Sequence, residues 1–152
     1  MTERATHHVT FTIERDFNAP PPMVFDAWAS PEAKATWFRG PTEWGPSEHA
    51  LDFRVGGRET SRGGPKGGPV HEYDARYFDI IANRRIIYGY DMRLGDKRIS
   101  VSLATVEFKP WEGGTRLVYT EQAVFLDGYD DPAGPERGTR ELLDALGKVL
   151  DR

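Results

Sequence analysis

The sequence predicts a single α+β domain in which a sheet of antiparallel strands closes around a long C-terminal helix. Three observations predict this class. Several segments alternate apolar and polar residues and are joined by short turns, which is typical of antiparallel pairing. Two short helical segments follow the first of these strands. The chain then ends in one long amphipathic segment, whose apolar stripe has to be buried against the sheet.

Composition excludes several classes of function. The chain has 152 residues and no cysteine, so it holds no disulfide, thiolate nucleophile or cysteine metal site. Its formal net charge is −4 with both signs interspersed, which predicts no nucleic-acid partner. No segment reaches the roughly 18 apolar residues of a membrane span. We therefore expect one cytoplasmic, soluble domain over residues 1–152, with a flexible N-terminus over residues 1–8 that is not a signal peptide.

The first third of the chain predicts a strand and two short helices. Residues 9–17 alternate apolar and polar side chains, as a half-buried strand does. The proline run 20–22 suits the first turn of a helix, because proline lacks an amide hydrogen. Ser30-Pro31 is a second helix start with serine as the cap, and this helix is expected to end near Trp37-Phe38.

Five further strands are expected before the final helix. The first of them covers residues 51–55 and stops at Gly56-Gly57. The segment from Gly56 to Pro69 is rich in glycine, proline, lysine and arginine, which predicts a mobile loop at the rim of the sheet. A change of register near Phe78 indicates a β-bulge. The remaining four strands are expected at residues 70–81, 86–92, 99–108 and 115–126.

The final helix is expected after two start signals, Asp131-Pro132 and Gly134-Pro135. Its apolar side chains recur at helical spacing and should pack on the sheet. They are Leu142, Leu143, Leu146, Val149 and Leu150.

Several motifs carry a resemblance to a known family. They are APPPMVFDAW at 19–28, SPE at 30–32, DFRVGGR at 52–58, TEQAVFLDG at 120–128 and GTRELL at 138–143. With this order of elements, the chain resembles the START-like (SRPBCC) superfamily. Within it, the chain is similar to the bacterial branch named after the heat-shock protein 90 ATPase activator homologue, also described as polyketide cyclase-like. The resemblance implies a helix-grip fold, in which a curved antiparallel sheet holds the C-terminal helix with a cavity between them.

The resemblance leaves three classes of function open, because one fold hosts many activities. The favoured class is the binding of a small hydrophobic, aromatic or amphiphilic molecule in the cavity, without catalysis. The second is a chaperone-associated interaction module, and the third is a cyclase or hydrolase with Glu121 or His71 as general base. A homodimer also stays open. The side chains expected to line the cavity are Trp37, Phe53, His71, Tyr73, Tyr88, Tyr90, Glu121, Phe125, Leu142 and Leu146.

Glu121 is the most informative candidate. Strand alternation places it inward among apolar side chains, where an isolated carboxylate is costly unless it is protonated or paired. No lysine or arginine shares that strand face, so we expect a raised pKa, with an ion pair to an arginine from another segment as the alternative. The buried tyrosines need hydrogen-bond partners, which indicates a partly polar pocket.

No cofactor or metal is expected. The four histidines, His7, His8, His49 and His71, lack the spacing of a metal site. The glycine-rich stretch 63–69 differs from a phosphate-binding P-loop, because its lysine precedes the second glycine pair and a strand follows.

Overall fold

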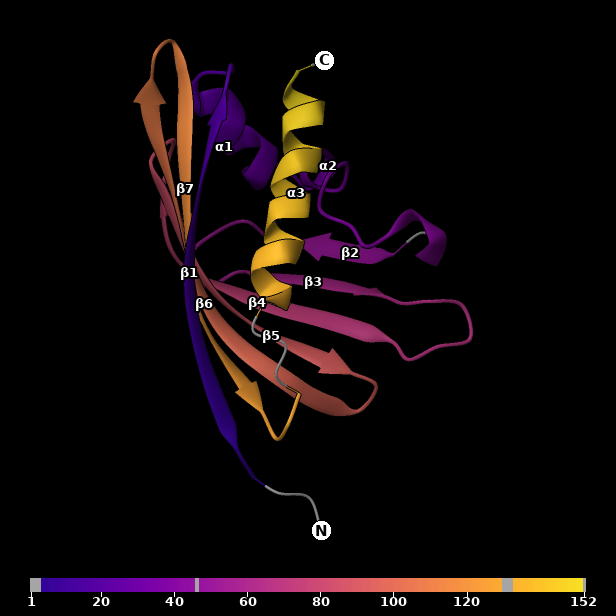
Figure 1. The fold of residues 1–152 in the computed structure, drawn as a ribbon. Coiled ribbons are helices and arrows are strands. Elements are labelled where there is room, and N and C mark those ends of the chain that lie inside the picture. The colour runs from indigo at the N-terminus through magenta and orange to yellow at the C-terminus, as the bar shows by residue number, and fades with distance from the viewer. Residues whose placement is uncertain (1–3, 46, 130–132, 152) are drawn as a thin grey trace.

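The computed structural model describes residues 4–45, 47–129 and 133–151. In this part of the chain, seven strands form one antiparallel sheet in the order β1-β7-β6-β5-β4-β3-β2. The sheet is curved, and the helix α3 (Gly134–Leu150) lies along its concave side (Figure 1). The strands are β1 (Thr6–Phe17), β2 (Glu48–Leu51), β3 (Arg58–Gly63), β4 (His71–Ile81), β5 (Arg85–Leu94), β6 (Lys97–Trp111) and β7 (Gly114–Leu126). The predicted α+β helix-grip fold is confirmed.

The N-terminal strand begins earlier than the sequence predicts. β1 pairs with β7 along its whole length, from Thr6 opposite Leu126 to Phe17 opposite Thr115. Residues 6–8 are thus part of the sheet, so the flexible terminus predicted for residues 1–8 does not include them. The sequence pattern missed Thr6, His7 and His8 because these residues are exposed and polar. Backbone pairing with β7, and not burial of their side chains, makes them part of the strand.

The two short helices are confirmed, but the second ends at Lys34, before the expected end near Trp37-Phe38. Residues 35–38 follow it as turns, in which the Phe38 amide donates to the Lys34 carbonyl at 2.8 Å. α1 (Pro21–Ala29) begins with proline in its first turn and buries Val24, Phe25, Ala27 and Trp28. α2 (Pro31–Lys34) is capped by Ser30, whose hydroxyl accepts a hydrogen bond from the Ala33 amide at 3.2 Å. A further single turn, η1 (Thr42–Trp44), precedes β2.

The prediction between residues 48 and 69 was wrong. No strand forms over residues 52–55: β2 covers Glu48–Leu51 and shares only Leu51 with the strand expected at residues 51–55. Residues 52–57 turn back through a hydrogen bond from the Asp52 amide to the Arg58 carbonyl at 2.8 Å. A further strand, β3, occupies the first half of the predicted mobile loop. Its sequence RETSRG contains no apolar residue, so hydrophobic alternation could not indicate it.

The remaining strands follow the prediction. β4 to β7 are joined by tight turns, and the register of β4 against β5 shifts between Tyr77 and Asp79, which confirms the bulge near Phe78. α3 buries Leu143 and Leu146 fully and Leu142, Val149 and Leu150 in part. The start signal Asp131-Pro132 lies outside the described residues. No described helix is long and apolar enough to cross a membrane.

Candidate functional site

Five tyrosines form a continuous band across the concave face of the sheet. Tyr73 and Tyr77 come from β4, Tyr88 and Tyr90 from β5, and Tyr119 from β7. Ring centroids lie 4.9 Å apart for Tyr73–Tyr90, 5.7 Å for Tyr77–Tyr88 and 6.1 Å for Tyr88–Tyr90, and the Tyr88 and Tyr119 hydroxyls are 3.5 Å apart. Burial raises the pKa of all five phenols. We call these residues the tyrosine band.

Glu121 lies at one end of the tyrosine band. Its side chain is fully buried, which confirms its predicted inward position. The Tyr119 hydroxyl donates to its Oε1 at 2.5 Å, and the Tyr90 hydroxyl donates to its Oε2 at 2.7 Å. Burial raises the pKa of Glu121, and the hydrogen bonds from Tyr119, Tyr90 and Ser102 oppose this rise without cancelling it. In the described part of the chain no lysine or arginine pairs with it, so the raised pKa agrees with the prediction from the sequence.

A second buried carboxylate, Glu59 of β3, lies at the other end of the band. Its Oε1 accepts from Lys34 Nζ at 2.6 Å and from the Tyr77 hydroxyl at 2.8 Å, and its Oε2 lies 2.7 Å from His49 Nε2. Burial alone would raise the pKa of Glu59, but the Lys34 charge and these hydrogen bonds outweigh it and lower the pKa. Glu59 is therefore held as an anion, in contrast to Glu121.

Lys34 reaches Glu59 through a cage of aromatic rings. Its side chain is completely buried, and its Nζ lies 4.5 Å from the centroid of Phe38 and between 5.3 and 6.0 Å from the rings of Trp28, Tyr77 and Tyr88. Cations are attracted to the faces of such rings. Burial lowers the pKa of Lys34, against the attraction of Glu59. The contact joins α2 to the sheet.

The sequence interpretation missed this cluster. Glu59 lies in a segment without any apolar residue, so it gave no sign of burial. Lys34 did carry one signal, because Trp37 and Phe38 follow it three and four residues later, the spacing of one helix face. His49 was considered only as a metal ligand. No group of three or more histidine and carboxylate side chains suited to a metal occurs in the described ranges.

The predicted lining residues occupy different environments. Tyr73, Tyr88, Tyr90 and Glu121 are brought together in or beside the band, and Phe53 contacts Tyr77 at 5.1 Å between centroids. Trp37 packs against Trp28 and Phe38, and its indole nitrogen donates to the Ala27 carbonyl at 3.0 Å.

The other four lining residues lie outside the band. The His71 ring lies tilted against that of Trp44, with 4.7 Å between ring centroids, and burial lowers the pKa of His71. Leu146 and Phe125 are buried and Leu142 is half-buried.

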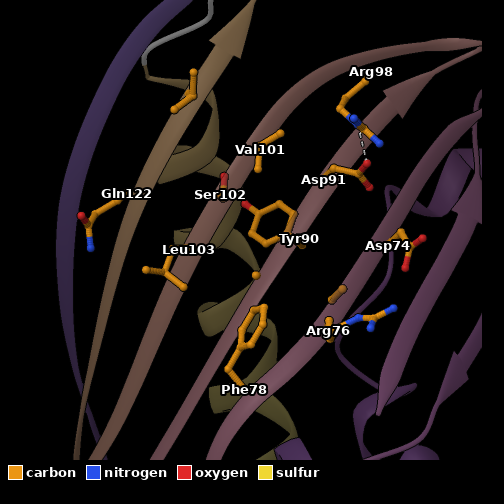
Figure 2. A pocket seen from close by; sticks show the side chains of 13 residues that line it. Asp74, Arg76, Phe78, Tyr90, Asp91, Arg98, Val101, Ser102, Leu103 and Gln122 are labelled. Atoms are coloured by element: carbon orange, nitrogen blue, oxygen red, sulfur yellow. Dashed lines mark hydrogen bonds and ion pairs between the residues drawn. The ribbon is translucent and has the colours of Figure 1, made fainter. Parts of the chain in front are cut away.

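Hollows lie along the outer face of the sheet. The larger, of about 600 Å³, lies on the outer face, away from α3, where Phe78, Val101 and Leu103 are exposed (Figure 2). It is not the cavity that the resemblance implies. The smaller, of about 360 Å³, lies at the β2–β5 end of the same outer face, where the ion pairs Arg58–Asp74 and Arg62–Glu72 line it.

The comparison with protein families identifies the chain. A family model described as Activator of Hsp90 ATPase homolog 1-like protein matches residues 18–151. The chain belongs to this family. Among solved structures, this family member is similar to an uncharacterized protein of Rhizobium leguminosarum, with 49% identity, a TM-score of 0.95 and 99% of each chain covered. A protein of Rhizobium loti is 43% identical, with a TM-score of 0.88 over 95% of this chain and 99% of its own.

More distant relatives share the fold alone. A protein of Chromobacterium violaceum is 23% identical, with a TM-score of 0.75 over 94% of this chain and 97% of its own. A comparison with curated proteins finds no match.

Proposed function

We propose that this protein binds a small hydrophobic or aromatic molecule on the concave face of its sheet, beside the tyrosine band. The observation that carries the proposal is that Tyr73 and Tyr90 point to the concave side and yet stay only half-buried. α3 buries its side chains against the other part of this face, through Leu143 and Leu146. Part of the aromatic surface inside the sheet therefore remains open to a ligand.

The chemistry of this surface favours an amphiphilic aromatic ligand. Tyrosine offers a flat apolar ring together with a hydroxyl that needs a partner when it is buried. Ligand sites are commonly built from such rings with a few polar groups that fix orientation. The open part of the band is bordered by Glu121, held by Tyr90, and by Phe38, whose ring centroid is 5.1 Å from that of Tyr73.

The proposal is tested by a binding screen. Aromatic acids, fatty acids, flavonoid-like compounds and naphthalene are titrated against the protein while tryptophan emission is recorded. Trp37 contacts Phe38, which contacts Tyr73, so a bound ligand should quench Trp37 saturably and Trp37→Phe should remove much of the signal. Binding should weaken in Tyr90→Ala. It should be unchanged in Phe78→Ala, a matched aromatic truncation on the outer face.

Two results would reject binding on the concave face. One is the absence of saturation by every compound in wild-type protein. The other is a loss of affinity in Phe78→Ala with none in Tyr90→Ala. Both variants are first checked for native circular dichroism, so that a folding defect is not taken for a binding defect.

A chaperone-associated role is the second candidate, because the family description names an activator of the Hsp90 ATPase. The expected result is no change when the protein is added to a bacterial chaperone of that class at micromolar concentration. A several-fold rise in ATP turnover would favour the chaperone role over ligand binding.

A further inference from the structure

The first half of strand β6 carries its polar and apolar side chains on the faces opposite to those of an ordinary half-buried strand. Ser100 and Ser102 point inward and are buried, with 6% and 5% of their surface exposed. Val101 and Leu103 point outward, with 43% and 41% exposed. An antiparallel sheet with one face in water normally shows the reverse, apolar residues inward and polar residues outward. The inversion favours a second surface that covers the outer face at β6.

The neighbouring strands extend this apolar surface. Phe78 of β4 is 57% exposed, and its ring lies against Gly89 of β5, where an added Cβ atom would be 3.0 Å from Phe78 Cε2. Val124 of β7 is paired with Val101 and is half-buried. We call Phe78, Val101, Leu103 and Val124 the outer patch, which lines the hollow of about 600 Å³ (Figure 2). An exposed apolar patch rimmed by polar residues is typical of an interaction site.

Charged side chains of both signs border the outer patch. Within the described ranges no carboxylate pairs with Arg76, and the residue directly opposite it on β3 is another arginine, Arg58. Asp74, two residues before Arg76 on the same face of β4, accepts from Arg58 Nη2 at 2.7 Å. A carboxylate has about four acceptor positions, so Asp74 can accept from a second arginine as well. The border thus offers an unpaired cation and an anion with acceptor capacity left.

Pairing across the sheet arranges these residues in two adjacent rows. The first row, read from β4 to β7, is Arg76, Gly89, Leu103 and Gln122. The second row, read in the same direction, is Asp74, Asp91, Val101 and Val124. A twofold axis that lies parallel to the sheet, crosses the strands and passes between the rows sets the first row of one copy over the second row of another. Arg76 then lies over the partner's Asp74 and Leu103 over the partner's Val101, and each of these contacts occurs twice.

We propose that the outer patch is the contact between two copies of this chain, packed sheet on sheet around this twofold axis. Aligned sheets pack face to face about 10 Å apart, with interdigitated side chains. A twofold contact uses the same patch on both copies, so charge pairing across it needs both signs on one patch, as found here. A uniformly charged partner, such as an anionic membrane, would meet Asp74 and Asp91 as well as the arginines. Asp91 enters the contact as an ion pair, because Arg98 Nε donates to it at 2.7 Å.

The contact involves few apolar side chains on each copy. We therefore expect a reversible dimer with a dissociation constant in the micromolar range, and not an obligate one. The contact is on the opposite face of the sheet from the tyrosine band, so it does not depend on the ligand proposed for the concave face.

Sedimentation velocity at increasing protein concentration, up to the millimolar range, measures this equilibrium. Wild-type protein should change from monomer to dimer. Leu103→Glu places a charge in the apolar centre of the contact. Arg76→Asp and Asp74→Arg each set like charges over one another, twice in every dimer. Each of the three variants should raise the dissociation constant about tenfold or more, because like charges in a contact are strongly unfavourable.

Mixing the two charge variants tests the twofold arrangement itself. In a dimer that contains one Arg76→Asp chain and one Asp74→Arg chain, the two replaced side chains lie over one another with opposite charges. The unchanged Asp74 of the first chain lies over the unchanged Arg76 of the second. An equimolar mixture should therefore dimerise within about threefold of the wild-type dissociation constant, although neither variant does so alone.

Two matched controls lie outside the outer patch. Arg84→Asp, in the turn between β4 and β5, changes the charge by the same amount as Arg76→Asp, and Met23→Glu adds a charge at an exposed apolar residue of α1. Both should dimerise as wild-type protein does. The proposal is overturned by wild-type protein that stays monomeric, by a dimer that survives Leu103→Glu or Arg76→Asp, or by a mixture that stays monomeric. Native circular dichroism of every variant ensures that a folding defect is not taken for a loss of contact.

Discussion

Glu59 and Glu121 are both fully buried on the same face of the sheet, yet their surroundings favour opposite protonation states. Glu121 receives only hydroxyl hydrogen bonds, and burial raises its pKa. Glu59 contacts a lysine, and its pKa is lowered. Strand alternation in β7 was sufficient to predict the burial of Glu121 and the direction of its pKa shift. Glu59 could not be predicted, because its lysine comes from a helix 25 residues earlier in the chain and its own strand has no apolar pattern.

The raised pKa of Glu121 predicts a specific pH dependence of stability. The folded state holds the Glu121 proton more tightly than the unfolded state does, where the pKa is near 4.5. The stabilisation is therefore complete below about pH 4.5 and is lost as the pH rises through the folded-state pKa. Glutamine has nearly the same size as glutamate and still forms hydrogen bonds, but it cannot ionise. In Glu121→Gln the free energy of unfolding should therefore decrease less as the pH rises. Urea denaturation between pH 4.5 and 8 measures it.

The control for Glu121 is Glu14→Gln, an exposed carboxylate on the other face of β1. That variant should show the same change in the free energy of unfolding with pH as the wild-type protein. If Glu121→Gln also showed this change, the carboxylate would not be a buried acid in the folded protein.

The Lys34–Glu59 pair gives a second prediction at this scale. Replacing Lys34 by Met removes the cation and leaves a buried anion with His49 and Tyr77 as its remaining partners. Breaking a buried pair from one side typically costs about 3–5 kcal/mol. Lys34→Met should show a loss of this size in urea denaturation, and adding Glu59→Gln should restore part of it. A double variant that is less stable than Lys34→Met would contradict the account of an uncompensated charge.

Among the elements, α3 and β3 illustrate what sequence patterns can indicate. The apolar stripe of α3 repeats at helical spacing over 17 residues, so its existence and its buried face could be predicted. β3 is polar throughout and is held by backbone pairing on both sides, by β2 and β4. Its outward side chains form surface ion pairs, such as Arg58 with Asp74, that only appear once the neighbouring strand is known.

The packing of α3 predicts the cost of truncating its central leucine. Leu146 has no exposed surface. Leu146→Ala should lower the free energy of unfolding by about 2–5 kcal/mol, since it removes buried methyl groups and leaves a cavity. Glu141→Ala, on the exposed side of the same helix, should change stability by about 0.5 kcal/mol or less. Equal losses in the two variants would mean that α3 is not held through this stripe.

For the whole molecule, the sheet order places the chain's first strand beside its last. β1 pairs with β7, while β2 lies at the opposite edge and pairs only with β3. Antiparallel pairing of successive strands could be predicted from the short turns between them, but the β1–β7 contact joins segments about a hundred residues apart. No local pattern in the sequence indicates this contact, and it was not predicted.

This order predicts a gradient of hydrogen exchange across the sheet. β6 and β7 have neighbours on both sides, whereas β2 is a four-residue edge strand. Backbone opening is easiest where few buried contacts hold a segment. Amides of β2 should exchange fastest among the strands, and those of β6 and β7 slowest, in deuterium exchange read by mass spectrometry. Comparable protection of β2 and β6 would contradict the edge assignment.

The tyrosine band also has an optical consequence. It contains five of the six tyrosines in the chain, and burial raises the pKa of each of the five. Ionised phenol absorbs at longer ultraviolet wavelengths than neutral phenol does, so the alkaline spectrum of the folded protein should lack most of its tyrosinate signal. The missing absorbance should appear in one step when the protein is unfolded with urea at the same alkaline pH. The ultraviolet spectrum therefore reports, without an added label, whether the sheet is folded around α3.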